Sequence, residues 1–244
     1  MLLALDVGNS NIKTGLFDGE TLLNSWRMAS DRNKAGDEFG MAMIEFFAYT
    51  GRNIKNVQGV IIASVVPGLN YTLDRMIKSY FGQDPIFVSS ENKLGITIDY
   101  EPANGLGADR IANAVAAYDT YGGPCITVDF GTATTFGAID ADGTFVGGAI
   151  APGIRSSTEA VVSQAAQLHR FDFEKPTSAM AKNTIEALQS GTIYGFSGLA
   201  DSIIAHIKEE LGEAKVIGTG GLSNVITKES KQIDTVDRLL TLNG

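Results

Sequence analysis

The spacing of hydrophobic and polar residues over the first 90 positions predicts short strands that alternate with helices. Leu2–Val7 and Ile12–Phe17 follow strand patterns, and Asp18-Gly19 is a typical hairpin turn signal after the second of them. In Asp37–Tyr49 the apolar residues stand three and four positions apart, which predicts a helix. The further predicted strands are Leu22–Met28, Val57–Val65 and Pro85–Val88, and a second helix is predicted over Leu69–Phe81. This order indicates an α/β fold whose sheet has a partly antiparallel edge.

A second series of elements follows a stretch, residues 92–108, in which glycine and proline interrupt regular structure. We expect a helix from Asp109 to about Thr120 and a new strand that opens at Cys125. The segment Gly147–Gly153 is too rich in glycine for a helix. The remaining predictions are a strand over Thr135–Ile139, a helix over Ser156–Leu168 with Ser156 or Ser157 as its N-cap, a mostly helical stretch Thr184–Leu211 interrupted around Gly191–Gly198, a strand over Lys215–Gly218 and a tight turn at Thr219-Gly220-Gly221.

The second series repeats the first. Leu5–Ser10 is echoed by Val128–Ala133, and each block follows an apolar run and precedes a strand, a glycine turn and another strand. Two copies of one topology predict two similar domains, residues 1–117 and 118–244. The alternative is chance, because an apolar residue followed by Asp-x-Gly is common where a strand runs into a turn.

Composition narrows the classes of function. The 244 residues include 28 acidic and 19 basic side chains, and a net charge of −9 argues against binding of a nucleic-acid backbone. The single cysteine, Cys125, excludes an intramolecular disulfide and a cysteine-based zinc site. No apolar run approaches the ~20 residues of a membrane-spanning helix, and the N-terminus carries no basic region of a signal peptide. We therefore expect a cytoplasmic protein with no membrane or nucleic-acid partner.

The two repeated loops are candidates for phosphate binding. A loop of Gly, Asn, Ser and Thr after a buried strand exposes backbone amides that can hold phosphate oxygens. Asp6 and Asp129 stand at the strand ends, and carboxylates beside phosphates need a cation to balance them. Lys13 can reach back to a phosphate as a point charge. With the late Gly220-Gly221 turn, the pattern suits a nucleoside triphosphate held between two domains, and neither a P-loop nor a dinucleotide fingerprint is present.

The segment Gly107-Ala108-Asp109-Arg110 has two compatible interpretations. In the first, Asp109 is a helix N-cap and Arg110 a solvated residue of the first turn. In the second, Asp109 is the general base that takes the proton of a substrate hydroxyl, and Arg110 binds an anion.

These motifs together resemble the type III pantothenate kinases, which are related to actin and the sugar kinases. The matching blocks are Asp6–Lys13, Gly107–Arg110, Asp129–Thr135, Gly147–Gly153, Lys182–Thr184 and Gly220-Gly221. The resemblance implies an α/β fold of two actin-like (ribonuclease H-like) domains, each a mixed sheet flanked by helices, with an ATP cleft between them. It implies ATP-dependent phosphorylation of pantothenate, the first step towards coenzyme A. Gly137 departs from the family pattern, which often has Asp at this position.

The resemblance also implies roles for individual residues. Asp109 is the proton acceptor, Asp129 holds a monovalent cation (K⁺ or NH₄⁺), Mg²⁺ accompanies ATP, and the family is dimeric. The expected ATP contacts are Asp6, Val7, Gly8, Asn9, Ser10, Asn11, Ile12, Lys13 and Thr132, and the expected pantothenate contacts are Tyr100, Gly107, Ala108, Asp109, Arg110 and Thr184.

Several of these residues also have a structural interpretation. Arg110 can form a surface ion pair, Tyr100 can pack at a strand end, and Thr184 can be a helix N-cap. Two other functions stay open: a nucleotide-sensing regulatory protein on the same fold, and a kinase of another small alcohol.

Overall fold

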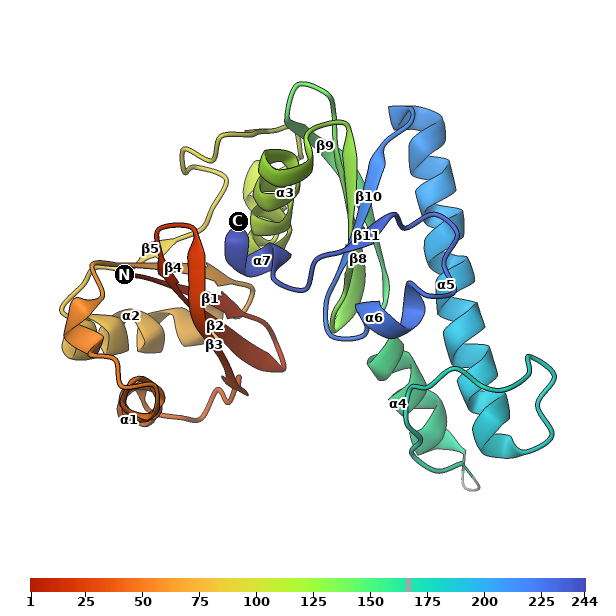
Figure 1. The fold of residues 1–244 in the computed structure, drawn as a ribbon, viewed down its shortest axis with the longest axis horizontal. Coiled ribbons are helices and arrows are strands. Elements are labelled where there is room, and N and C mark those ends of the chain that lie inside the picture. Colours follow the sequence, from red (N-terminus) through yellow and green to blue (C-terminus); the bar gives the residue numbers. More distant parts are fainter. Residues whose placement is uncertain (166–167) are drawn as a thin grey trace. The chain divides into compact units, whose positions relative to one another are not determined.

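The computed structural model describes residues 1–165 and 168–244, and the contacts within it divide the chain into two compact units. The first unit comprises Met1–Asn92 and Asn104–Ala112, and the second comprises Lys93–Ala103 and Asn113–Gly244. Figure 1 shows the course of the chain through both units, and each is described here by itself.

The first unit is built on a five-stranded mixed sheet with strand order β3-β2-β1-β4-β5. β1 pairs with β2 in antiparallel and with β4 in parallel orientation, so the predicted antiparallel edge is confirmed. The elements of this unit are β1 (Leu2–Val7), β2 (Asn11–Asp18), β3 (Thr21–Ala29), α1 (Gly36–Tyr49), the 3₁₀ turn Ile54–Asn56, β4 (Gly59–Ser64), α2 (Pro67–Phe81) and β5 (Ile86–Phe87). All the strands and helices predicted over this part of the chain are present.

Helices α1 and α2 cover one face of this sheet. Phe39, Met43 and Phe47 of α1 share a buried core cluster with alternate residues of β1, such as Leu3 and Leu5. Because side chains alternate across a strand, Ala4 and Asp6 point to the opposite face. The start of α3 (Ala108–Tyr121) supplies residues to that second face, where Ala108 and Ala112 pack against Ala63 of β4.

The second unit repeats this topology. Its sheet has the order β11-β10-β7-β8-β9-β6, so β9-β8-β7-β10-β11 corresponds to β3-β2-β1-β4-β5, with β6 added at the edge. β7 pairs antiparallel with β8 and parallel with β10, as β1 does with β2 and β4. The strands are β6 (Thr97–Ile98), β7 (Cys125–Phe130), β8 (Ala133–Ile139), β9 (Thr144–Pro152), β10 (Lys215–Thr219) and β11 (Thr235–Val236). The repeat read from the sequence is therefore a repeat of structure rather than chance.

The helices of the second unit differ in two places from the prediction. They are α4 (Ile154–Gln164), α5 (Thr184–Leu211), α6 (Ser223–Ile226) and α7 (Leu240–Asn243), and the 3₁₀ turn Ala103–Gly105 precedes α3. The N-cap of α4 is Gly153 rather than Ser156 or Ser157, because Ile154 is already buried in the core. The predicted end at Leu168 is wrong, because α4 ends at Gln164 and neither Ala165 nor Leu168 is helical; residues 166–167 lie outside the described residues.

The predicted interruption of α5 is wrong. α5 runs unbroken over 28 residues. Each glycine costs about 1 kcal/mol relative to alanine in a helix, but Ile193, Ala200 and Ile204 bury their side chains against the sheet. Packing of one helix face outweighs the low propensity of its glycines.

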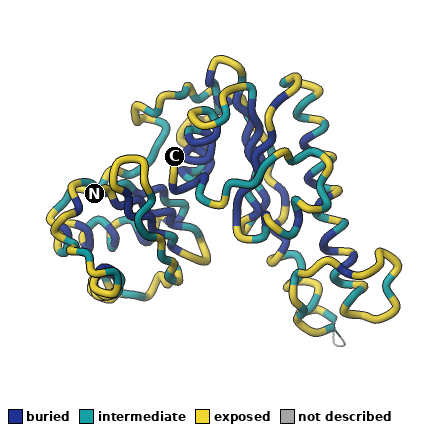
Figure 2. Tube along the Cα trace, viewed as in Figure 1, coloured by how far each residue is buried: buried dark blue, intermediate teal, exposed yellow. Residues whose placement is uncertain are grey.

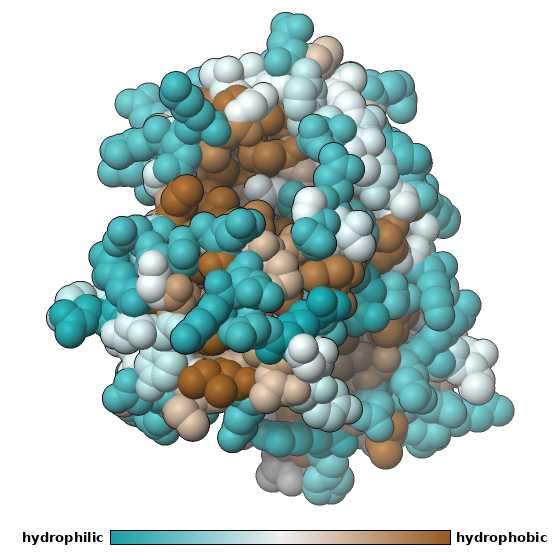
Figure 3. Space-filling model, turned by 60° about the vertical axis from the view of Figure 1, so that its left-hand side comes forward, coloured by the Kyte–Doolittle hydropathy of each residue, from teal (hydrophilic) through white to brown (hydrophobic). Residues whose placement is uncertain are grey.

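Buried residues run along the strands of both sheets, and exposed residues gather in the loops and at the ends of helices (Figure 2). Hydrophilic residues form most of the surface visible in Figure 3, with hydrophobic residues in patches between them, as is usual for folded proteins. Among the described residues, none of the helices is both long and apolar enough to cross a membrane.

Candidate functional site

The first candidate phosphate loop connects β1 to β2 and is held by a local network of hydrogen bonds. The amide of Gly8 donates to the carbonyl of Asn11 at 3.0 Å, and the hydroxyl of Ser30 donates to the carbonyl of Gly8 at 2.5 Å. Arg32 Nη2 donates to Asn9 Oδ1 at 3.0 Å. The loop is therefore shaped before any ligand binds, and it brings an arginine beside Asn9.

Asp6 and Lys13 form an ion pair at the base of this loop. They are directly opposite each other in the β1–β2 ladder, and Lys13 Nζ donates to Asp6 Oδ2 at 2.9 Å. The side chains are 11% (Asp6) and 26% (Lys13) exposed, so the pair is shielded from solvent on most sides. The positive charge of Lys13 on β2 therefore faces the carboxylate of Asp6 at the end of β1.

Asp109 lies on the same face of the first sheet, in the first turn of α3. Its Oδ1 accepts a hydrogen bond of 2.8 Å from the amide of Arg110. Burial raises the pKa of Asp109 above its ordinary value, the Arg110 amide opposes this rise, and the negative charge of Asp6 adds to it. The charge of Asp6 therefore acts on Asp109 within one unit, and a carboxyl with a raised pKa is a better proton acceptor.

Gly107 makes room for this carboxylate. A Cβ at Gly107 would lie 2.6 Å from Asp109 Oδ1. The carbonyl of Gly107 accepts the hydrogen bond of Ile111, so Gly107 takes the N-cap position. The interpretation of Asp109 as the N-cap is wrong, since Asp109 is inside the helix. Arg110 is only 6% exposed, so its interpretation as a solvated residue is also wrong.

The second candidate loop joins β7 to β8 and has the same construction. Asp129 is the penultimate residue of β7, as Asp6 is of β1, and the amide of Gly131 donates to the carbonyl of Ala133 at 3.1 Å. Thr132 is supported from α4, because the hydroxyl of Ser156 donates to the Thr132 carbonyl at 3.1 Å.

The glycine turn after β10 lies directly against Asp129. A Cβ at Gly220 would be 2.4 Å from Asp129 Oδ1, and Gly220 has a φ of 94°. Only glycine accommodates both the positive φ and the close approach. The second unit therefore brings Asp129, the Thr132 loop and the Gly220-Gly221 turn together.

Asn113 is a site residue that the sequence analysis missed. It follows Asp109 by one helical turn, is 1% exposed, and donates from Nδ2 to Asp129 Oδ2 at 3.3 Å. Its Oδ1 accepts a hydrogen bond of 2.8 Å from the hydroxyl of Thr241. The sequence contains one signal for this residue: Asn113 is the single polar side chain in the apolar run Ile111–Ala117, and a buried polar side chain needs a hydrogen-bond partner.

Tyr100 and Thr184, two of the expected pantothenate contacts, both belong to the second unit. The ring of Tyr100 packs edge to face on Phe145 with centroids 6.0 Å apart, next to the short strand β6. Thr184 is the exposed first residue of α5 and is not the N-cap, because Asn183 Oδ1 accepts the amide of Glu186 at 2.9 Å. The predicted pantothenate contacts are thus distributed over both units.

Asp129 is the one carboxylate that the structure places beside the Gly220-Gly221 turn of the second unit, among the described residues. Over residues 1–165 and 168–244, no group of three or more His, Cys, Asp or Glu side chains comes together that could hold a metal. Asp129 supplies one carboxylate, and the backbone of Phe130 and Gly220 lies next to it.

Comparison with solved structures defines the class of fold. The polyphosphate/ATP-glucomannokinase from Arthrobacter sp. strain KM has a TM-score of 0.54 at 15% identity, with 99% of this chain and 95% of that chain covered. A Baf family transcriptional activator from Campylobacter jejuni gives 0.61 at 22% identity, covering 98% and 93%. The fold is therefore the duplicated α/β fold of actin-like and sugar kinases, shared with a protein described as a regulator.

The sequence comparisons identify the family within that class. The family model "Type III pantothenate kinase" matches residues 2–206. A type III pantothenate kinase from Moorella thermoacetica is 47% identical over 245 aligned residues, which cover all of this chain and 96% of the relative. The chain belongs to the type III pantothenate kinase family.

Proposed function

We propose that this protein transfers the terminal phosphoryl group of ATP to the primary hydroxyl of pantothenate, giving 4′-phosphopantothenate in the first step of coenzyme A biosynthesis. Family membership supports the overall reaction. The observation that carries the proposal is the half-buried carboxylate of Asp109, on the face of the first sheet that also carries Asp6 and Lys13. A kinase that acts on an alcohol needs a positioned base beside a phosphate-binding loop.

In this proposal Asp109 accepts the proton of the pantothenate hydroxyl as the oxygen attacks the γ-phosphorus atom. Its raised pKa favours proton transfer, and the fixed hydrogen bond from the Arg110 amide holds one carboxylate oxygen so that the other is directed to the substrate. Arg110 pairs with the pantothenate carboxylate through its planar guanidinium. Gly107, Ala108, Tyr100 and Thr184 complete the acceptor contacts.

The nucleotide is held by the loop residues 6–13 and by Thr132. Mg²⁺ bound to ATP would neutralise phosphate charge, and Lys13 would exchange its contact with Asp6 for one with a phosphate oxygen. Asp129 holds a K⁺ or NH₄⁺ ion, which supplies positive charge next to the second loop. The ladder favours this assignment because Thr135, which has no charge, stands opposite Asp129 where Lys13 stands opposite Asp6.

We also propose that the protein is a cytoplasmic homodimer whose acceptor pocket lies at or near the subunit interface, and that the domain boundary falls at residues 117–118. The exposed position of Thr184 favours the dimer, since a contact residue on the surface of one chain can serve a pocket that a second chain completes.

The test is a coupled assay of ADP formation with ATP, Mg²⁺, K⁺ and pantothenate, together with mass spectrometry of the product. Asp109→Asn should lower turnover by about 10²-fold or more. Asp119→Asn, an exposed aspartate near the end of the same helix, is the matched control and should leave turnover unchanged.

Each alternative function predicts a different outcome of this assay. A nucleotide-sensing protein would bind ATP and give no phosphorylated pantothenate, whereas a kinase of another alcohol would show no stabilisation by pantothenate in a thermal-shift assay. If Asp109→Asn matches wild-type turnover, Asp109 is not the base.

A further inference from the structure

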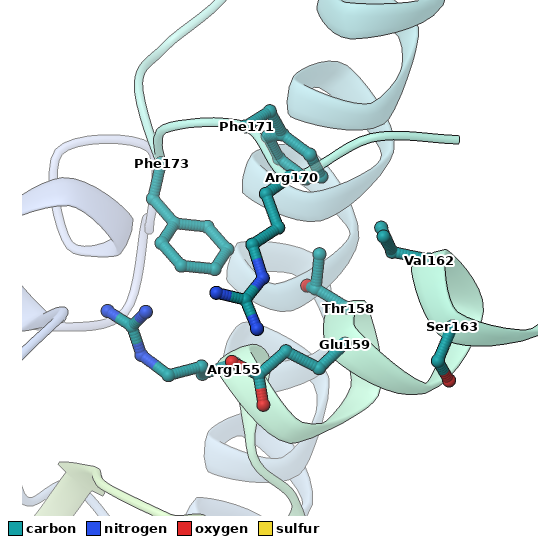
Figure 4. A pocket seen from close by; sticks show the side chains of 8 residues that line it. All are labelled: Arg155, Thr158, Glu159, Val162, Ser163, Arg170, Phe171 and Phe173. Atoms are coloured by element: carbon teal, nitrogen blue, oxygen red, sulfur yellow. The ribbon is translucent and has the colours of Figure 1, made fainter. Parts of the chain in front are cut away.

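A cavity lies in the second unit, and none of the residues that line it is assigned to ATP or pantothenate. It has a volume of about 340 Å³ and is formed by one face of α4 and by residues 170–173 (Figure 4). Arg155, Thr158 and Glu159 come from α4, and Arg170, Phe171 and Phe173 come from the opposite wall. None of these residues takes part in the reaction proposed above.

The walls of the cavity are fixed by contacts with the rest of the unit. Phe173 packs against the core cluster of the second sheet. The side-chain amide of Gln189 in α5 donates to the carbonyl of Asp172 at 3.0 Å, and Lys175 pairs with Glu229 at 2.8 Å. The segment at residues 171–175 is therefore held on both sides of Phe173.

The chemistry of the lining combines positive charge with aromatic rings. The guanidinium of Arg155 lies 5.2 Å from the centre of the Phe173 ring, and Figure 4 shows Arg170 extending into the same cavity from the other wall. Phe171 and Phe173 pack edge to face, with centroids 5.7 Å apart. Within the described residues, neither arginine forms an ion pair with a carboxylate, although Glu159 lines the same cavity.

We propose that this cavity binds a small phosphate ester that carries a flat ring. Two guanidinium groups offer more N–H donors than one carboxylate can accept, whereas the three terminal oxygens of a phosphate ester can accept from both. The phenylalanine rings provide an apolar surface for the ring of the ligand. The hydroxyl of Thr158 already donates to the Ile154 carbonyl, so its oxygen and the Glu159 carboxylate are left to accept from donors on the ligand.

The test uses phenyl phosphate as the probe, with the intact protein saturated with Mg²⁺ and a non-hydrolysable ATP analogue so that the nucleotide loops are occupied. In isothermal titration calorimetry, we expect one molecule to bind per chain with a dissociation constant of about 1 mM or tighter. Inorganic phosphate, which lacks the ring, and benzoate, which lacks the phosphate, should each bind more weakly.

Variants locate the binding. Arg155→Met and Arg170→Met should each weaken phenyl phosphate binding about tenfold, and both residues are exposed, so the variants should fold. Arg75→Met, at an exposed arginine of α2, is the matched control and should bind as the wild type does. Phe171→Leu keeps apolar volume but removes the ring face, and it should weaken binding without affecting inorganic phosphate.

The proposal is overturned if phenyl phosphate shows no binding at roughly 10 mM, which is tenfold above the expected dissociation constant. It is equally overturned if binding persists unchanged in the Arg155→Met/Arg170→Met double variant, because the probe then occupies another place. These outcomes do not depend on kinase activity, so they are distinct from a failure of the proposed function.

Discussion

The Gly107→Ala variant tests whether catalysis depends on the position of the Asp109 carboxylate, because it should displace this carboxylate with little effect on the stability of the fold. The new Cβ would lie 2.6 Å from Asp109 Oδ1 and 3.5 Å from Val65 Cγ1, and real Cβ atoms do not approach other heavy atoms closer than 3.0 Å. The carboxylate must retreat by about half an ångström, which a side-chain end can do without moving the backbone. The hydrogen bond from the Arg110 amide, 2.8 Å long, must then lengthen or bend.

The expected cost is small for folding and large for catalysis. Alanine is a poorer N-cap than glycine, which costs about 1 kcal/mol and lowers Tm by about 2–4 °C. Misplacement of a base by such a distance lowers turnover by about tenfold to a hundredfold. In the Asp109→Asn background, Gly107→Ala should cause little further loss, because the two changes affect one group.

The assay is steady-state ADP formation with pantothenate, alongside thermal unfolding of the same samples. Gly68→Ala is the matched control, since a Cβ there meets no atom within 4 Å, and it should keep wild-type turnover. Wild-type turnover of Gly107→Ala would refute the argument that Asp109 acts from its observed position. A loss of activity accompanied by unfolding at the assay temperature would refute the claimed separation of catalysis from stability.

Three further predictions follow from the same geometry. The base must be deprotonated and the pKa of Asp109 is raised, so kcat/KM should already fall with decreasing pH above 3.8, the ordinary pKa of aspartate. Asp6→Asn removes a negative charge that raises this pKa and should therefore move the fall to lower pH. A pH profile unchanged by Asp6→Asn would contradict the electrostatic coupling between Asp6 and Asp109. Turnover should be higher in K⁺ than in Na⁺ buffers, and Asp129→Asn should abolish the difference; equal rates for the wild type would exclude a selective cation at Asp129. Gly137→Ala should lower the free energy of unfolding by about 1–3 kcal/mol, since a Cβ there would lie 2.8 Å from Thr127 Oγ1 and 2.9 Å from Phe145 Cε2; an unchanged Tm would contradict this packing.

The predictable part of the fold rests on short-range patterns. Strands such as β1 and β7 alternate or run apolar and end at Asp-x-Gly, and these local signals recur in the same order in both halves. The shared order of five strands in the two sheets, to which the second sheet adds β6, follows from that recurrence. The departure at Gly137 also has a local cause, because β8 presents this position to Thr127 and Phe145, where no side chain fits.

Two wrong predictions, the interruption of α5 and the cap of α4, concern positions where tertiary packing determines the structure. Propensity alone favours an interruption at the glycines of α5, and the burial of Ile193 and Ile204 against the sheet overrides it. The serine expected to cap α4 instead supports the Thr132 loop through a hydrogen bond across 24 positions. Neither contact leaves a signal within a short window of sequence.

The two copies of the strand-end aspartate show how one motif acquires two chemistries. Asp6 and Asp129 occupy equivalent places, but the first faces a lysine across its own hairpin and the second faces a threonine. Asp129 instead accepts from Asn113, whose amide oxygen is held by Thr241 at a separation of 128 residues. The strand-end motif of each copy can therefore be predicted from the sequence, whereas the hydrogen bond from Asn113 to Asp129 cannot, because its residues lie far from the motif in the chain. Lys13 faces the first carboxylate across its own hairpin, whereas a threonine stands opposite the second, and this difference is the reason for proposing the monovalent cation at Asp129 and not at Asp6.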